Sequence, residues 1–282
     1  MKINLQIQAN KRQFNRRLTI AGKVIEIVDY EIPILKGYNT NRKGRKNACY
    51  TSEETKAENR AKIGQRARKT VRDTANANPQ LDKFLTLTYA ENMTDLKRAR
   101  YDFDKFIKRL KSIHKDLQYI EVVEFQKRGA IHFHLLCNLP YVDVNFLSEK
   151  VWKLGFVKLN RLDNIDNVGA YVTKYMSKDN IDERLIGKKC YSMSKGLNKP
   201  KCYTSDKDDI DEIIQHISKE KIVRTYSNEY ETEYYGVVRY TQIVCSATPN
   251  VPSPRSLWEY FLTHNAKSRL VRPRSFVQPN GV

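Results

Sequence analysis

The chain has 282 residues, of which 40% are hydrophobic, so it can bury a core without disulfides or a structural metal. Its 51 Lys and Arg against 32 Asp and Glu give a net charge of +19. This charge favours a polyanionic partner such as nucleic acid, because each neutralised phosphate releases a condensed counterion. The five cysteines form no C-x-x-C pair, no apolar segment reaches the length of a membrane span, and we expect a soluble intracellular protein.

The first part of the chain is the most basic. Residues 1–80 hold 18 Lys and Arg against 7 Asp and Glu, a net charge of +11. The stretch "RLTIAGKVIEIVDYEI" (17–32) predicts a strand. A capping box from Thr51 to Glu54 then opens a polar, basic helix that runs to about Ala75. Because that helix has little apolar stripe, we expect it on the surface, either solvated or against a phosphate backbone.

Residues 81–203 are predicted to form an α+β unit with a βαββαβ order. Its strands are predicted at "FLTLTY" (84–89), "QYIEVVEF" (118–125), "AIHFHLLC" (130–137) and "GFVKLNRL" (155–162). Its helices are predicted from Thr94 to Ile113, at "VNFLSEKVWKL" (144–154) and at "NIDNVGAYVTKYMSK" (164–178). This order is typical of a ferredoxin-like fold, an antiparallel sheet with helices on one face, which leaves the other face open for a ligand.

The hairpin within this unit brings two histidines and a carboxylate together. Side chains alternate along a strand, so His132 and His134 share one face of the sheet. A turn over 126–129 puts Glu124 directly opposite His132, whereas Glu121 has the wrong parity and falls on the core side or the rim. Two imidazoles and one carboxylate are suitable ligands for a divalent metal. The alternative is that each histidine merely packs or forms hydrogen bonds.

The last helix of the unit carries candidate nucleophiles. Its apolar stripe, expected to dock on the sheet, consists of Ile165, Val168, Val172 and Met176. Tyr171, Tyr175, Lys174 and Lys178 follow the flank of that stripe, so two phenols and two ammonium groups lie together. A neighbouring cation favours the phenolate, which is the nucleophilic form. The alternative is an amphipathic helix with half-buried tyrosines and solvated lysines.

These three motifs carry a resemblance to a known family. In their order, "FLTLTY", "IHFHLL" and "YVTKYMSK" resemble motifs one, two and three of the HUH endonucleases, as arranged in rolling-circle replication initiators. The resemblance covers about residues 81–180. It extends through "KKCYSMSKGLNKP" (188–200), which is similar to a segment that follows the tyrosine helix in phage- and plasmid-type initiators.

The resemblance implies a metal-dependent nick in single-stranded DNA. His132, His134 and Glu124 would hold Mg²⁺ or Mn²⁺, and a tyrosine would attack the phosphate to give a 5′-phosphotyrosine and a free 3′-OH primer. Tyr171 and Tyr175 both fit the apolar-x-x-Tyr-apolar-x-Lys pattern, as in two-tyrosine initiators of single-stranded DNA phages. Single-tyrosine relatives leave a structural role open for the second tyrosine, and we expect Tyr171 to make the first cleavage.

The resemblance also implies partners. We expect single-stranded DNA at a replication origin to contact Lys127, Arg128, Lys188, Lys189 and Lys195. The chain has no G-x-x-x-x-G-K-[ST] motif, so initiation would need a separate helicase besides a DNA polymerase. The expected location is the cytoplasm of a bacterial cell that carries a mobile element or phage. The alternatives are an HUH transposase, a zinc hydrolase with the same ligands, and a non-catalytic module that binds single-stranded nucleic acid.

The rest of the chain is predicted to support this core. Residues 204–245 are expected to pack on the core as a helix (207–220) and a strand hairpin (221–245) that pairs with the N-terminal strands. The tyrosines of that hairpin are expected to pack in the sheet or to stack on bases. Residues 246–282, which are rich in Pro and basic residues, are predicted to form an extended tail.

Overall fold

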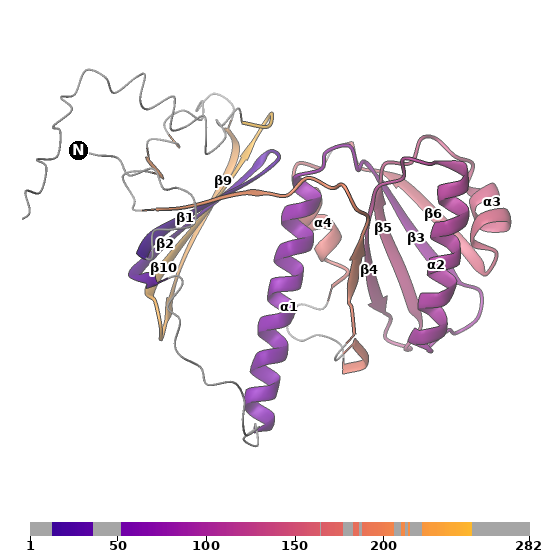
Figure 1. Ribbon diagram of the computed structural model, residues 1–282, viewed down its shortest axis with the longest axis horizontal. Coiled ribbons are helices and arrows are strands. Elements are labelled where there is room, and N and C mark those ends of the chain that lie inside the picture. Colours follow the sequence, from indigo (N-terminus) through magenta and orange to yellow (C-terminus); the bar gives the residue numbers. More distant parts are fainter. Residues whose placement is uncertain are drawn as a thin grey trace, which may run out of the picture.

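A computed structural model of the chain describes residues 13–35, 52–163, 165–176, 183–185, 188–205, 210–211, 214 and 222–249. These residues form two five-stranded sheets, with α1 and α4 between them and further helices beyond the second sheet (Figure 1). The helices are α1 (Glu53–Asn76), α2 (Leu96–Ile113), α3 (Val144–Phe146) with its π-helical continuation (Leu147–Trp152), α4 (Val168–Thr173) and a 3-10 turn (Glu183–Leu185). Among the described helices, none is both long and apolar enough to cross a membrane.

The first sheet joins segments from distant parts of the chain. Its strands are β1 (Gln13–Ala21), β2 (Val24–Leu35), β8 (Lys201–Ser205), β9 (Ile222–Thr232) and β10 (Gly236–Cys245). They run in the order β8-β1-β2-β10-β9, and all neighbours are antiparallel. The predicted C-terminal hairpin is confirmed, as is its pairing with an N-terminal strand. The single strand predicted over 17–32 is wrong, because Gly22 (φ +55°) turns the chain into a hairpin between β1 and β2.

The second sheet is the predicted βαββαβ unit, and it confirms the α+β, ferredoxin-like fold class. Its strands are β3 (Lys83–Tyr89), β4 (Tyr119–Phe125), β5 (Ile131–Cys137), β6 (Gly155–Arg161) and the short β7 (Tyr191–Met193). The order is β6-β3-β5-β4-β7, and all neighbours are antiparallel. On one face, α2 and α3 cover a core in which Phe103 and Phe106 pack against Phe133.

The other face of the second sheet is partly covered, whereas the sequence predicted helices on one face only. Val71 of α1 and Val172 of α4 are buried there against Phe84 and Leu136. The predicted apolar stripe of the tyrosine helix is therefore confirmed, since all four of its members pack into this cluster. The helix itself is shorter than predicted over 164–178, because α4 ends at Thr173.

Helix α1 differs from the predicted surface helix at its C-terminal end. It begins after Ser52, whose side chain accepts a hydrogen bond from the Thr55 amide, and its first turns are exposed. Its last turns are buried between the sheets, although Asp73 and Thr74 there are polar. Burial by polar contacts leaves no apolar periodicity in the sequence, so the expectation of a wholly exposed helix was wrong.

Candidate functional site

The hairpin turn brings the predicted triad into register. The Gln126 amide donates to the Ala130 carbonyl at 2.8 Å, and Gly129 adopts the left-handed conformation (φ +86°) that the turn requires. The resulting pairing places Glu124 opposite His132, as predicted. Glu121 lies on the opposite face and is fully buried, which confirms the parity assigned to it.

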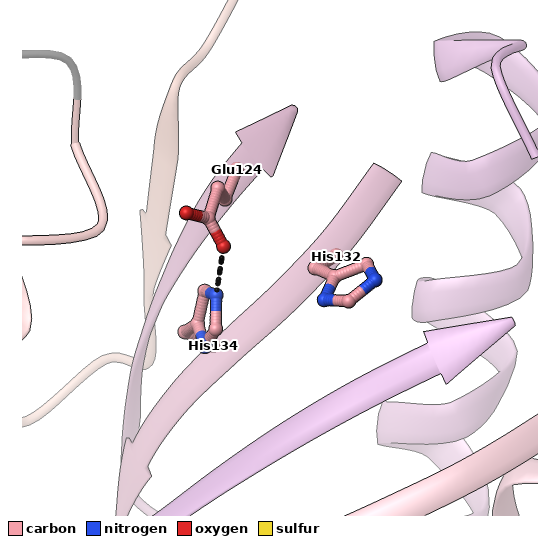
Figure 2. A group of neighbouring side chains, drawn as sticks. All are labelled: Glu124, His132 and His134. Atoms are coloured by element: carbon pink, nitrogen blue, oxygen red, sulfur yellow. Dashed lines mark hydrogen bonds and ion pairs between the residues drawn. The ribbon is translucent and has the colours of Figure 1, made fainter. Parts of the chain in front are cut away.

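The three side chains converge on one point (Figure 2). One ligand atom from each of Glu124, His132 and His134 lies within 4.8 Å of the others. The Oε2 atom of Glu124 is 2.7 Å from Nε2 of His134, so the carboxylate and that imidazole already face one another. His132 and His134 are nearly buried, at 8% and 3% exposure, while Glu124 is half-buried.

Neighbouring side chains orient the two imidazoles through their other nitrogen. Nδ1 of His134 is 3.1 Å from Oγ1 of Thr86, and Nδ1 of His132 is 3.4 Å from the Gln126 side-chain nitrogen. Both Nε2 atoms are thereby turned toward the carboxylate side of the site. Within the described chain, Nε2 of His132 is buried without a hydrogen-bond partner. An unpaired buried nitrogen beside a second imidazole and a carboxylate fits a divalent metal ion.

The electrostatics of the triad keep the ligand atoms in the state that a metal requires. The hydrogen bond from His134 holds the pKa of Glu124 below its usual value. Burial, with the neighbouring His134, lowers the pKa of His132. An ionised carboxylate and a neutral imidazole are the ligating forms of these groups.

The two candidate nucleophiles lie against this triad. The ring of Tyr175 stacks on His134 with a centroid distance of 4.0 Å, and its hydroxyl donates to the Tyr171 hydroxyl at 3.4 Å. Phe84 packs against both tyrosine rings at centroid distances of 5.1 and 5.2 Å. Burial and the hydrogen bond to Tyr171 raise the pKa of Tyr175 to about 12. The structure therefore brings both phenols to the metal-ligand cluster.

The predicted basic residues lie at different distances from the cluster. Lys174 is exposed, and its Nζ lies 5.4 Å from the Tyr171 ring centroid, whereas Lys178 is outside the described residues. Lys127 and Arg128 are exposed in the turn beside Glu124. The carbonyl of Lys189 accepts a hydrogen bond from Arg100.

Strand pairing separates the lysines of the 188–200 segment. Val122 pairs with Tyr191, so Lys188 and Lys189 lie at the Glu124 end of β4 and both are exposed. Lys195 is exposed near the opposite end of that strand, about 20 Å away at 3.3 Å per residue.

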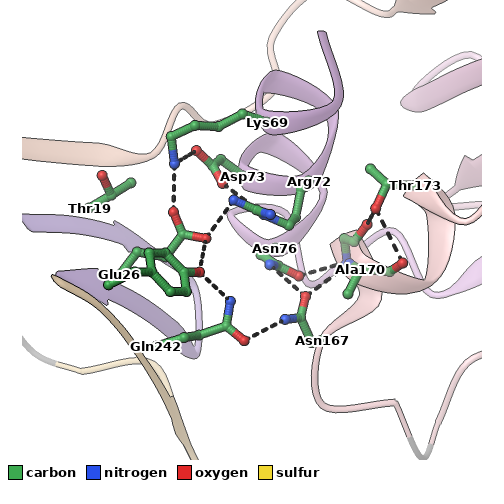
Figure 3. A network of polar contacts seen from close by, with 12 residues as sticks. Thr19, Glu26, Lys69, Arg72, Asp73, Asn76, Asn167, Ala170, Thr173 and Gln242 are labelled. Carbon is green, nitrogen blue, oxygen red and sulfur yellow. Dashed lines mark hydrogen bonds and ion pairs between the residues drawn. The ribbon is translucent and has the colours of Figure 1, made fainter. Parts of the chain in front are cut away.

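A polar network holds the start of α4 (Figure 3). Oδ1 of Asn167 caps the helix by accepting from the Ala170 amide at 2.9 Å. Asn76 of α1 donates to that same oxygen at 2.9 Å and accepts from the Gly169 amide at 2.8 Å. The approach of the two helices is so close that a Cβ on Gly169 would lie 2.1 Å from the Arg72 carbonyl oxygen.

The network continues into the first sheet. Asn167 donates to the Gln242 side chain at 3.4 Å, and Gln242 donates to the Tyr240 hydroxyl at 2.9 Å. Tyr240 in turn donates to Glu26 at 2.9 Å. The buried Glu26 also pairs with Lys69 and Arg72 of α1, at 2.5 and 2.7 Å. Sequence reasoning did not identify this connection between the first sheet and the tyrosine helix.

Sequence reasoning also missed the residues that orient the imidazoles. The alternation in "FLTLTY" does contain a signal, because it puts Thr86 and Thr88 on one face of β3. The register then pairs Thr86 with His134 and Thr88 with His132. No sequence signal marks Gln126 beyond its position in the turn.

Comparison with known proteins points to replication. Residues 82–180 match the family model of the replication-associated protein ORF2. The match spans the triad and both tyrosines. The chain is also similar to the "Phasyl DNA replicon protein arp" of Escherichia coli, with 30% identity over 122 residues. That alignment covers 34% of this chain and 42% of the relative, so it spans less than half of the relative's length. No solved structure matches the chain. The two similarities support a replication initiator.

Proposed function

We propose that the chain is a rolling-circle replication initiator of the HUH type, which nicks and joins single-stranded DNA through a tyrosine. The observation that carries the proposal is the stack of Tyr175 on His134, which joins a two-tyrosine helix to a triad of potential metal ligands. The similarity of residues 82–180 to replication-associated proteins supports the same function.

The proposed reaction is a transesterification at phosphorus. The phenolic oxygen of Tyr171 attacks the scissile phosphate, and the bond from phosphorus to the 3′ oxygen breaks. The products are a 5′-phosphotyrosine and a 3′ oxygen that takes up a proton to become the primer hydroxyl. We choose Tyr171 for the first attack because the Lys174 ammonium lies over its ring, whereas the Tyr175 ring is held by its stack on His134.

The triad would hold Mg²⁺ or Mn²⁺ through Glu124, His132 and His134. When bound, such an ion would polarise the scissile phosphate and stabilise charge on its oxygens. Thr86 and Gln126 would fix the orientation of the imidazoles. The mixed set of two nitrogens and one carboxylate suits Mn²⁺ better than Mg²⁺, because Mg²⁺ binds mainly through oxygen.

Tyr175 would be the second nucleophile. The two hydroxyls are 3.4 Å apart, so a strand held on one tyrosine lies within reach of the other. Alternation between them would allow nicking, strand retention and rejoining. The partners of this activity would be single-stranded origin DNA, a separate helicase and a DNA polymerase.

The test is direct detection of a covalent adduct. The protein is incubated with labelled single-stranded origin DNA and Mn²⁺, and a denaturing gel is examined for a protein band that carries the label. We expect an adduct that requires the metal. Cleavage without an adduct would instead favour a zinc hydrolase, and binding without cleavage a non-catalytic module.

A further inference from the structure

Strand β6 carries an exposed aromatic side chain on the same face as the triad. Phe156 is 70% exposed and therefore contributes little to the core. The pairing aligns it with Thr88 of β3, which in turn pairs with His132 of β5. Phe156, Thr88, His132 and Glu124 thus form one row across four neighbouring strands. Two strand spacings separate Phe156 from His132, about 10 Å.

The next row on this face adds a cation. Lys158 pairs with Thr86, and Thr86 pairs with His134. Lys158 is exposed, and no described residue forms an ion pair with it. The side chains between β6 and the histidines are the short threonines, so nothing in these two rows stands between Phe156 or Lys158 and solvent above the face.

An aromatic ring and a cation two residues apart on one strand face match the chemistry of single-stranded nucleic acid. Bases stack on aromatic rings whatever their identity, and phosphates pair with nearby cations. The charges around the triad favour the same ligand, because Lys127, Arg128 and Lys174 are also exposed there. We propose that Phe156 and Lys158 form a subsite that stacks one base and binds one phosphate beside the scissile position. This inference rests on the proposed function, whose substrate it places along β6.

The experiment measures binding without cleavage, so that it does not depend on nicking. Fluorescence anisotropy in metal-free buffer compares two labelled probes of about 20 nucleotides, an oligothymidylate and an abasic deoxyribose-phosphate oligomer of equal length. We expect Phe156→Ala to weaken binding of the oligothymidylate about tenfold, the typical loss for one stacked base, and to leave the abasic oligomer unaffected. Phe156→Trp should restore the affinity.

Lys158→Ala should behave differently from Phe156→Ala. It should weaken both probes and make the slope of log K against log[salt] shallower by about 0.7, as expected for one phosphate on a single strand. Tyr141→Ala is the matched control, because Tyr141 is an aromatic residue with 92% exposure outside β6. It should change neither probe.

The inference and the proposed function fail in different ways. Wild-type affinity of Phe156→Ala for the oligothymidylate would overturn the base subsite, whether or not the protein forms a tyrosine adduct. Equal losses on both probes would also overturn it, since they would not depend on a base. Absence of the adduct in the wild type would overturn the endonuclease function, while a base-dependent loss at Phe156 would still stand. Sedimentation showing that Phe156→Ala dissolves a dimer would reassign the face to a second copy of the chain.

Discussion

His134 and His132 are held differently, although both belong to the triad. His134 is stacked against Phe84 and Tyr175, with centroid distances of 5.6 and 4.0 Å. Its two ring nitrogens contact Thr86 and Glu124. His132 contacts Gln126 through one nitrogen, and its other nitrogen has no described partner. One histidine therefore contributes to packing as well as to ligation, and the other chiefly to ligation.

This difference predicts separable effects of two alanine substitutions. His132→Ala and His134→Ala should each lower adduct formation about 100-fold or more, because the loss of a metal is worth several kcal/mol of barrier. Only His134→Ala should also lower the free energy of unfolding, by about 1–3 kcal/mol, because it removes a stacked ring. Gel assays and urea denaturation measure the two quantities. His114→Ala is the control, since His114 lies at the C-terminal end of α2. Full nicking by both variants would remove the triad from the reaction.

The two tyrosines should also be separable by single substitutions. Phe keeps the ring and its packing but lacks the attacking oxygen, so Tyr171→Phe should fold, bind DNA and lose the covalent adduct. Tyr175→Phe should spare the first nick and impair rejoining. Mass spectrometry of the trapped adduct identifies the modified residue. A nucleotide found only on Tyr175 would reverse the two roles, and an adduct on neither would exclude the tyrosine mechanism.

At the scale of elements, the tyrosine helix is short and depends on contacts outside itself. A helix of one and a half turns is not stable alone, so its position is set by its cap and its neighbours. Asn76 supplies two hydrogen bonds to the start of α4, and Gly169 permits the close contact with α1. The orientation of Tyr171 and Tyr175 is thus determined partly by α1.

Asn76→Ala should consequently slow the chemistry more than it weakens DNA binding. We expect adduct formation at saturating DNA to fall about tenfold while the Kd for DNA stays within about twofold, as for a loss of positioning. Asn78→Ala is the matched control, because the buried Asn78 side chain bonds Thr74 and Asn198 and makes no contact with α4. Both variants should lose about 1–3 kcal/mol of stability. An equal loss of rate in both would show that Asn76 acts through stability alone.

The elements also show what the sequence can predict. Alternation and the turn over 126–129 were sufficient to place Glu124 opposite His132, because antiparallel register follows from the turn. Periodicity likewise identified the stripe that docks α4. The hairpin at Gly22 was missed because apolar residues continue on both sides of a two-residue turn. The burial of α1 was missed because it depends on partners for Lys69 and Arg72 that lie far away in sequence.

At the scale of the whole molecule, Glu26 links the first sheet to the rest of the fold. Its carboxylate is buried and is faced by Lys69, Arg72, Tyr240 and Asp73. Burial alone would raise the pKa of Glu26, but Arg72 and Lys69 outweigh it and hold the pKa below its ordinary value of 4.5. Burial raises the pKa of Asp73, which lies in the same network.

The pKa of Glu26 predicts how stability should depend on pH. A carboxylate with a lowered folded pKa stabilises the fold above the unfolded pKa, and this contribution is lost as the pH falls through the folded value. Glu26→Gln should therefore be less stable than the wild type by about 2 kcal/mol at neutral pH, and the difference should shrink below about pH 4.5. Asp73 is present in both proteins, so its opposite effect cancels in the difference. Urea denaturation across this pH range tests the prediction, and a difference independent of pH would contradict it.

The net charge of +19 makes DNA affinity a property of the whole surface, so contacts must be separated from general attraction. A deletion of residues 1–80 would not do this, since it would remove β1, β2 and α1. Replacing Lys188 and Lys189 by Ala should make the slope of log K against log[salt] shallower by about 1.4, because each phosphate contact on a single strand contributes about 0.7.

The control for this pair removes the same charge from another face. Lys111 and Lys115 are exposed at the C-terminal end of α2, which covers the face of the second sheet opposite the triad. Replacing both by Ala should leave the slope unchanged, because charges there act only through the screened long-range field. Anisotropy titrations over a range of salt concentrations measure both slopes. If the two pairs reduce the slope equally, Lys188 and Lys189 act through net charge and make no phosphate contacts of their own.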